Sequence, residues 1–211
     1  MRSIGHWTPR YILSRFIEII YQRMHPDYPW LTKSANSFLT SWLRENYEGL
    51  EFGSGRSTIW FAERINHLTS VEHNREWYQW VNQQIEDRQI SNVNYFLIEE
   101  QDSQDREYIE TSKYVAVARQ FENDSLDFAL VDGILRGPCA LMVTKKIKPG
   151  GILVVDNANW FLPCVSHSPG SRINGMGPAD SYWNDFLMCV KEWHCWWTSS
   201  GVTDTAIYYR E

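Results

Sequence analysis

The chain has 211 residues, of which 43% are hydrophobic, 15% aromatic and 22% charged. This composition excludes a disordered, collagen-like or small disulfide-stapled protein and predicts one sizeable core. The 20 Lys and Arg against 26 Asp and Glu give a formal charge of −6. That charge argues against nucleic acid as a partner, because nucleic-acid binding depends on neutralising phosphates. The 11 tryptophans are attributed mainly to the core, with a broad apolar pocket as the alternative.

The cysteines and the N-terminal sequence bear on the cellular compartment. The four cysteines form no CxxC pair, which predicts free thiols in a reducing compartment and no zinc site. The first ten residues hold no apolar signal core, and the apolar run that follows is interrupted by Arg15, Glu18 and Arg23. This pattern disfavours both secretion and stable membrane insertion. We therefore expect a cytoplasmic protein.

Two helices are predicted before the first strand. Thr8 as N-cap and Pro9 at the first helical position start one helix, which ends near residue 25. A second helix starts at about residue 34, with an apolar stripe along it. Residues 1–47 are therefore expected to form an N-terminal helical cap segment, which covers the sheet or serves as a lid.

After residue 47, short apolar runs alternate with helical stretches, the pattern of a parallel sheet covered on both faces. The predicted strands lie at 49–52, 67–72, 94–98, 127–132, 151–156, 194–199 and 205–210. The predicted helices lie at about 57–65, 75–88, 106–121, 138–147 and 179–192. A short glycine-containing turn separates the last two strands. We expect one domain at 48–211, an α/β, Rossmann-like doubly wound sheet, mostly parallel, with seven strands and a C-terminal antiparallel hairpin.

The first strand runs into a turn rich in small residues, Glu51-Phe-Gly53-Ser-Gly55-Arg-Ser57, before a helix. The two glycines lack Cβ atoms and the helix start presents free N–H groups, so a phosphate or a carboxylate can approach the backbone closely. A tight turn without a ligand is the alternative. Glu72 ends the next strand, about 20 residues on, where a carboxylate can accept both hydroxyls of a ribose.

This turn resembles the first motif of the class I S-adenosylmethionine-dependent methyltransferases, acid-x-Gly-x-Gly-x-Gly, with Ser57 in place of the third glycine. The resemblance extends from about residue 49 to the C-terminus. It implies that the methionine moiety lies near Glu51 and the glycines, that Glu72 holds the ribose, and that His73 and Asp102 flank the adenine. The cofactor-binding residues implied are Glu51, Gly53, Ser54, Gly55, Ser57, Glu72, His73, Asp102, Asp132 and Gly133.

Two later strands end in oxygen donors, Asp132 after one and Asp156-Asn157 after the next. Three such donors at adjacent strand ends suit Mg²⁺. The pattern is similar to that of catechol and caffeoyl-coenzyme A O-methyltransferases, which implies Asp132, Asp156 and Asn157 as metal ligands. Those enzymes carry a lysine three residues after the first Asp, where this chain has Leu135 and then Arg136, a poor general base. For the predicted ligands, the alternative is that Asp and Asn only form turns and caps at the strand ends. For Arg136, the alternative is an ion pair with Asp132.

The segment 158–179 is long for a connection inside a compact domain, so we expect it to form the acceptor pocket with Trp160 and His167. Asp132 and His167 are the candidate catalytic residues, and a plain surface position is the alternative for His167.

These features predict an S-adenosylmethionine-dependent methyltransferase that methylates an oxygen of a small-molecule acceptor, with assistance by Mg²⁺ left open. Catalysis would come mainly from alignment of the reacting atoms. A nicotinamide-dependent oxidoreductase is one alternative, disfavoured because Thr58 stands where GxGxxG needs glycine. A non-catalytic adenosine-ligand-binding module is another. A homodimer through the first helix also stays open.

Overall fold

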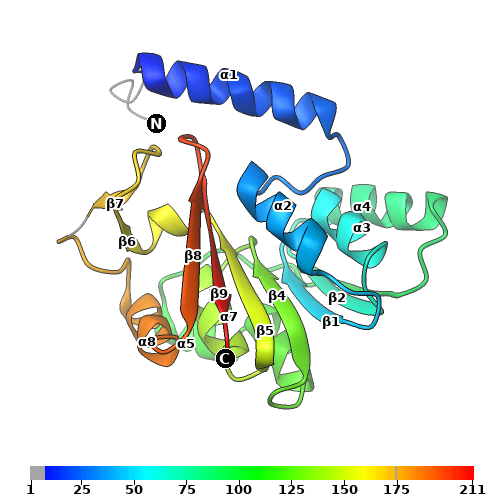
Figure 1. Cartoon of the computed structure of the whole chain (residues 1–211). Coiled ribbons are helices and arrows are strands. Elements are labelled where there is room, and N and C mark those ends of the chain that lie inside the picture. The colour runs from blue at the N-terminus through cyan, green and yellow to red at the C-terminus, as the bar shows by residue number, and fades with distance from the viewer. Residues whose placement is uncertain (1–7, 174) are drawn as a thin grey trace.

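The computed structural model describes residues 8–173 and 175–211. A seven-stranded sheet of order β3-β2-β1-β4-β5-β9-β8 lies at its centre (Figure 1). The strands β1 to β5 pair in parallel, and β9 runs antiparallel to both β5 and β8. The predicted Rossmann-like sheet with its terminal hairpin is therefore confirmed.

The strands begin and end within a few residues of the predicted positions. The seven strands of the sheet are β1 Glu48–Phe52, β2 His67–Glu72, β3 Val93–Leu97, β4 Leu126–Val131, β5 Ile147–Asp156, β8 His194–Ser199 and β9 Asp204–Tyr209. A further short parallel pair, β6 Pro163–Cys164 and β7 Arg172–Ile173, lies in the long connection after β5. That connection was predicted as an irregular loop.

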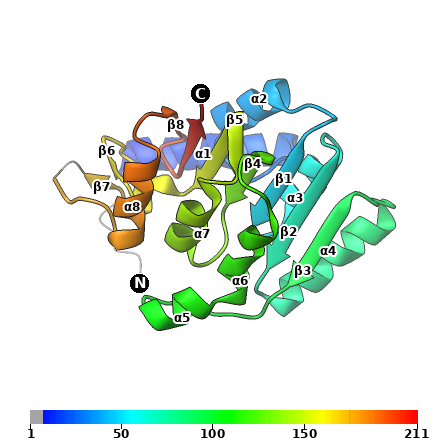
Figure 2. The ribbon, with the colours of Figure 1, turned by 90° about the horizontal axis from the view of Figure 1, so that it is seen from below.

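The helices cover both faces of the sheet. They are α1 Pro9–Met24, α2 Lys33–Trp42, α3 Arg56–Ala62, α4 Arg75–Asp87, α5 Arg106–Thr111, α6 Lys113–Ala116, α7 Arg136–Val143 and α8 Ser181–Cys189, with short 3₁₀ segments η2 Val117–Gln120 and η3 Ala158–Trp160. The helices α2, α3 and α4 lie on one face and α5 to α8 on the other (Figure 2). Among the described residues, no helix has both the length and the apolar character needed to cross a bilayer.

The single helix predicted at 106–121 is divided into α5, α6 and η2. Ser112 is the cause, because its hydroxyl accepts a hydrogen bond from the Val115 N–H and so starts a new helix. Glu100 fixes this cap, since its carboxylate accepts hydrogen bonds from the Ser112 hydroxyl and the Lys113 N–H.

Successive side chains of the central strands point to opposite faces of the sheet and contribute to two hydrophobic cores, one on each face. In β4, Phe128 and Leu130 pack with α2 and α3, whereas Ala129 and Val131 pack with α6, α7 and α8. Such two-sided burial is typical of a parallel sheet between helix layers. Trp60 and Trp183 lie in these two cores, but Trp196, which was also attributed to the core, is 44% exposed.

The first helix begins at Thr8, whose hydroxyl accepts a hydrogen bond from the Tyr11 N–H, as its sequence predicted. It packs differently from α2, which buries Ala35 and Leu39 against the sheet. None of the residues of α1 is buried. The helix lies across the carboxyl edge of the central strands, above the turn between β8 and β9 (Figure 1).

Candidate cofactor and acceptor site

The turn between β1 and α3 crosses the turn between β4 and α7. Gly53 has φ +91°, and a Cβ atom there would lie 2.5 Å from the backbone nitrogen of Gly133 and 2.8 Å from the carbonyl carbon of Asp132. Only glycine fits this backbone and this space. Gly55 is different, since its φ of 169° is extended backbone and a Cβ there would make ordinary contact with Trp77. The two turns therefore bring the predicted residues Gly53, Asp132 and Gly133 together.

Glu51 is fully buried beneath this turn. One carboxylate oxygen accepts hydrogen bonds of 2.6 Å from the hydroxyls of Thr58 and Ser70. Within the described part of the chain, the other oxygen, Oε1, has no hydrogen-bond partner. Burial raises the pKa of Glu51 to about 7, although the hydrogen bonds from Ser70 and Thr58 oppose this shift. An unpartnered buried oxygen is the exception in folded proteins and calls for a ligand or water.

Glu72 at the end of β2 is 2% exposed and is well supplied with donors. Its Oε2 accepts hydrogen bonds from the Ser54 N–H and hydroxyl, at 3.0 and 2.8 Å, and its Oε1 accepts from the N–H groups of His73 and Asn74, at 2.9 and 2.8 Å. Burial alone would raise the pKa of Glu72, but the hydrogen bonds from His73, Asn74 and Ser54 outweigh it and lower the pKa. The carboxylate therefore ties the glycine turn to β2.

Asp102, the residue predicted to flank the adenine, lies next to the β4–α7 turn and is exposed. Its Oδ1 accepts a hydrogen bond of 3.1 Å from the Leu135 N–H. Leu135 itself adopts the left-handed conformation with φ +48°, which is unfavourable for leucine. Gly133 completes this turn, because a Cβ atom there would lie 2.0 Å from the hydroxyl of Tyr114.

The three predicted metal ligands come together, but around the guanidinium of Arg136. This group donates 2.7 Å hydrogen bonds to the carbonyl oxygens of Asp132 and Asp156, a 2.9 Å bond to that of Gly133 and a 3.1 Å bond to Asn157 Oδ1. It also lies 2.9 Å from Asp132 Oδ1. Within residues 8–173 and 175–211, no group of three His, Cys, Asp or Glu side chains could hold a metal ion. The residues present do not fit the predicted Mg²⁺ site, because the guanidinium of Arg136 lies between them and already pairs with Asp132 Oδ1 and Asn157 Oδ1.

Asp156 faces Asp132 at the ends of β5 and β4. Asp156 is 5% exposed, and its Oδ1 accepts a hydrogen bond of 2.9 Å from the Thr205 hydroxyl. Burial, followed by the charge of Asp132, raises the pKa of Asp156 to about 8. Burial also raises the pKa of Asp132, although Arg136 opposes that shift. The raised pKa of Asp156 favours its protonated form at neutral pH.

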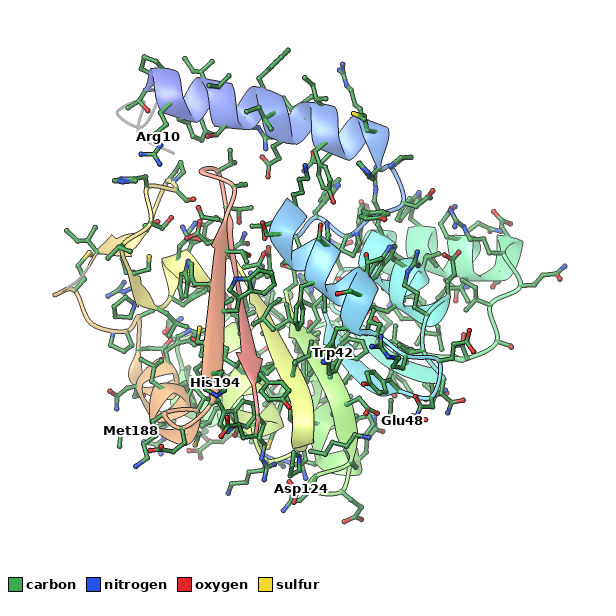
Figure 3. All side chains as sticks on the ribbon, in the orientation of Figure 1. Arg10, Trp42, Glu48, Asp124, Met188 and His194 are labelled. Carbon is green, nitrogen blue, oxygen red and sulfur yellow. The ribbon has the colours of Figure 1, made fainter. Side chains whose placement is uncertain are left out.

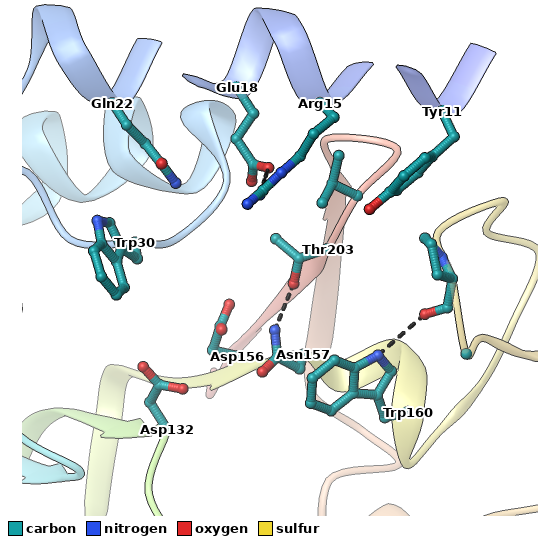
Figure 4. Close-up of a pocket in the computed structure, with 13 residues that line it drawn as sticks. Tyr11, Arg15, Glu18, Gln22, Trp30, Asp132, Asp156, Asn157, Trp160 and Thr203 are labelled. Atoms are coloured by element: carbon teal, nitrogen blue, oxygen red, sulfur yellow. Dashed lines mark hydrogen bonds and ion pairs between the residues drawn. The ribbon is translucent and has the colours of Figure 1, made fainter. Parts of the chain in front are cut away.

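A cavity of about 1050 Å³ opens above these carboxyl groups (Figure 4). Its floor is the carboxyl edge of β4 and β5, and α1 forms its roof. The side chains that line it are those of Tyr11, Arg15, Glu18, Gln22, Trp30, Asp132, Asp156, Asn157, Trp160, Pro169, Val202 and Thr203, together with Gly170. In the roof, Arg15 donates a 2.8 Å hydrogen bond to Glu18. In the wall, Trp160 Nε1 donates a 3.1 Å bond to the Pro169 carbonyl.

Trp160 thus lies where the sequence predicted an acceptor pocket, but His167 does not. His167 is exposed and is not part of the cavity lining, so the structure does not bring it together with Asp132. The roof residues of α1 were missed by the sequence analysis. Their spacing, with Tyr11, Arg15, Glu18 and Gln22 on the face opposite the apolar stripe, is a helical signal that could have identified them.

By sequence, the chain matches no protein-family model and no curated protein. By structure, it is similar to a methyltransferase from Geobacter sulfurreducens, with 10% identity, TM-score 0.56, and 93% of this chain and 88% of that chain covered. It is also similar to an rRNA methylase from Streptococcus thermophilus, with 10% identity, TM-score 0.54, and coverage of 84% and 94%.

A third similar structure is SMU.1697c from Streptococcus mutans, a protein assigned as a methyltransferase and solved in complex with SAH. It has 12% identity and TM-score 0.54, and covers 83% of this chain and 95% of that chain. The chain therefore has the fold of the class I S-adenosylmethionine-dependent methyltransferases, as its glycine motif indicated. The finer likeness to the catechol-type O-methyltransferases receives no support from these structures.

Proposed function

We propose that this chain is an S-adenosylmethionine-dependent methyltransferase that methylates an oxygen of a small molecule bound in the cavity beneath α1. One observation carries the proposal: Asp132 belongs to both halves of the site. Its backbone touches Gly53 of the glycine turn, and it lines the cavity. A cofactor on the turn and an acceptor in the cavity would meet at this residue, at the carboxyl edge where open α/β sheets bind ligands.

The residues around the glycine turn fit S-adenosylmethionine. Glu51 has an unpartnered buried oxygen that would accept a hydrogen bond from the ammonium group of the cofactor. Ribose hydroxyls would take the place of the Ser54 hydroxyl on Glu72. His73, Asp102 and Gly133 would surround the adenine, with Ser57 and Gly55 at the start of α3. When bound, the cofactor supplies an electrophilic methyl group.

The acceptor side of the site would bind and orient a hydroxyl group. Transfer of the methyl group would form an oxygen–carbon bond and break the sulfur–methyl bond of the cofactor, leaving S-adenosylhomocysteine, and Asp132 would accept the proton that the hydroxyl group releases. Burial favours that protonation because it raises the pKa of Asp132. Asp156, protonated at neutral pH, would donate a hydrogen bond to the acceptor. Arg136 would hold both carboxyl groups in place through their main chain.

Residues 1–47 are proposed as the cap of this site and 48–211 as the methyltransferase domain. Within the cap, the described helix α1 would close the cavity from above, while α2 anchors the segment to the sheet through Ala35 and Leu39. Residues 1–7 of the proposed cap lie outside the described part of the chain.

A nucleic-acid acceptor is the competing proposal, since one similar structure is described as an rRNA methylase. The formal charge of −6 disfavours it, as does a cavity lined by Glu18, Asp132 and Asp156. Both features favour a small, uncharged or cationic acceptor.

Calorimetric titration with S-adenosylhomocysteine tests the cofactor half of the proposal. We expect the wild-type protein to bind, and Glu51→Gln to bind about tenfold more weakly because a charge-assisted hydrogen bond to the ammonium group is lost. Glu48→Gln, at the half-buried start of the same strand, is the matched control and should bind like the wild type. Absence of binding by the wild-type protein would overturn the proposal.

The acceptor half is tested with radiolabelled S-adenosylmethionine and a panel of phenols, sugars and RNA. We expect transfer to a small hydroxyl compound, lowered about 100-fold or more in Asp132→Asn because the general base is removed. Transfer to RNA alone would contradict the small-molecule assignment and leave the cofactor assignment intact.

A further inference from the structure

The helix α1 has two faces of opposite character. Its polar face, with Arg15, Glu18 and Gln22, is turned toward the cavity. Six large apolar side chains on its other face are between 41% and 71% exposed: Ile12, Leu13, Phe16, Ile17, Ile20 and Met24. We define these six residues as the outer stripe of α1. The outer side of α1 faces away from the rest of the chain (Figures 1 and 3).

The outer stripe is too large and too continuous to be incidental. Its residues recur at intervals of three and four, so they form one band along four turns of helix. A continuous exposed apolar band of this kind marks an interaction surface, whereas scattered single apolar residues do not. A helix that only covered the cavity would present polar residues to water on its outer side. We therefore expect a binding partner to cover the outer stripe.

The charges of α1 indicate what covers this stripe. By helical spacing, Arg10 and Arg23 fall on opposite edges of the stripe, and both are exposed. The acidic residue of the helix, Glu18, has a side chain that is only 11% exposed and is paired with Arg15 on the cavity side. The outer face of α1 is therefore apolar and cationic, in a chain whose formal charge is −6.

We propose that the outer stripe binds the surface of an anionic phospholipid bilayer, with α1 lying in the interface. A helix with an apolar face bordered by arginines is suited to this position, because its apolar side chains enter the acyl boundary while the guanidinium groups contact lipid phosphates. The helix does not cross the bilayer.

A second copy of the chain fits the stripe less well. In an antiparallel pair of α1 helices, Arg10 of one copy would lie near Arg23 of the other, and in a parallel pair each arginine would lie near its own equivalent. Glu18 faces the cavity and cannot compensate these like charges. Like-charge pairing of this kind disfavours association, whereas anionic lipid removes the repulsion.

Flotation of the full-length protein with lipid vesicles tests this proposal. We expect binding to vesicles of phosphatidylcholine with phosphatidylglycerol, and little binding to phosphatidylcholine alone. The double variant Arg10→Gln/Arg23→Gln should bind about 25-fold more weakly, at about fivefold for each arginine. Leu13→Gln/Ile17→Gln should lose tenfold or more, because two apolar side chains leave the acyl region.

Met188→Gln is the matched control, since Met188 is 63% exposed on α8, away from α1 (Figure 3), and it should bind vesicles like the wild type. Because the substituted side chains are exposed, the variants should unfold at the wild-type urea concentration. Two outcomes would overturn the proposal: no binding of the wild type to anionic vesicles, or a lipid-free dimer in light scattering that Leu13→Gln/Ile17→Gln converts to a monomer. Neither depends on the methyltransferase assignment.

Discussion

Two acidic residues at the carboxyl edge of the sheet are almost equally buried but titrate in opposite directions. Glu72 at the end of β2 is 2% exposed and Asp156 at the end of β5 is 5% exposed. The pKa of Glu72 is lowered, whereas that of Asp156 is raised. The difference lies in their partners, because Glu72 accepts hydrogen bonds from Ser54, His73 and Asn74, whereas Asp156 accepts from Thr205 and faces Asp132.

This comparison shows that the supply of donors, rather than burial, decides which carboxyl group stays charged. It also separates two tasks. On the β2 side, the charge of Glu72 fixes the glycine turn. On the β5 side, a carboxyl group that keeps its proton offers the cavity both a donor and an acceptor, which suits a floor that binds hydroxyl groups.

The largest expected effect is that of Arg136→Met, which removes the guanidinium between the ends of β4 and β5. Three carbonyl oxygens, the Asp132 carboxylate and the Asn157 amide oxygen would lose their shared partner. Breaking this partly buried ion pair leaves three main-chain carbonyl oxygens without their donor, and we expect the free energy of unfolding, measured with urea, to fall by about 3 kcal/mol. Arg106→Met is the control and should unfold like the wild type, because Arg106 makes an exposed pair with Glu110 that contributes little to stability. Equal losses in both variants would show that Arg136 does not organise this edge.

The position of the Arg136 guanidinium is an example of what the sequence could not predict. The sheet, its terminal hairpin and the strand-end positions of Glu51, Glu72, Asp132 and Asp156 could be predicted, because apolar alternation and small-residue turns are local signals. The order of the strands in the sheet was not predicted, because it depends on contacts between distant segments. The sequence left two alternatives open for Arg136, and only packing decides that its guanidinium occupies the space between the two strand ends. The same limit applies to the predicted magnesium site, whose ligands were placed together correctly but around a different cation.

Other errors have a similar cause. The apolar stripe of α1 predicted a helix correctly, but periodicity does not reveal whether an apolar face meets the sheet or the outside. Its polar face was therefore not connected with the acceptor cavity. His167 was selected by residue type within a long segment, and the path of such a segment depends on contacts such as that between Trp160 and Pro169, which no local pattern encodes.

On the β2 side, Glu72→Gln should reduce the free energy of unfolding at pH 7 by about 2 kcal/mol. The glutamine amide keeps the shape but places a donor among the donors of Ser54, His73 and Asn74, and it removes the charge that strengthened those hydrogen bonds. Because the pKa of Glu72 is lowered in the folded state, its contribution is present above the unfolded pKa of about 4.3 and is lost as pH falls through the folded pKa. The deficit of the variant should therefore shrink in acid. Glu99→Gln, which breaks the exposed pair with Arg75, is the control and should unfold like the wild type, because exposed ion pairs contribute little to stability.

The smallest expected effect has the opposite sign. In Asp156→Asn the amide oxygen still accepts the hydrogen bond from Thr205, and the residue can no longer ionise. The folded pKa of Asp156 is raised to about 8, above the unfolded value of about 3.9. Between these values the folded state holds a proton that the unfolded state has lost, so stability falls as pH rises through this window. Urea unfolding from pH 5 to pH 9 should show the variant gaining stability relative to the wild type as pH rises, and being the more stable protein by at least about 1 kcal/mol at pH 9. Some pH dependence should persist in the variant, because burial also raises the pKa of Glu51 to about 7. A variant that is less stable than the wild type at pH 9 would mean that Asp156 is charged and paired like Glu72, and the distinction between the two ends of the sheet would fail.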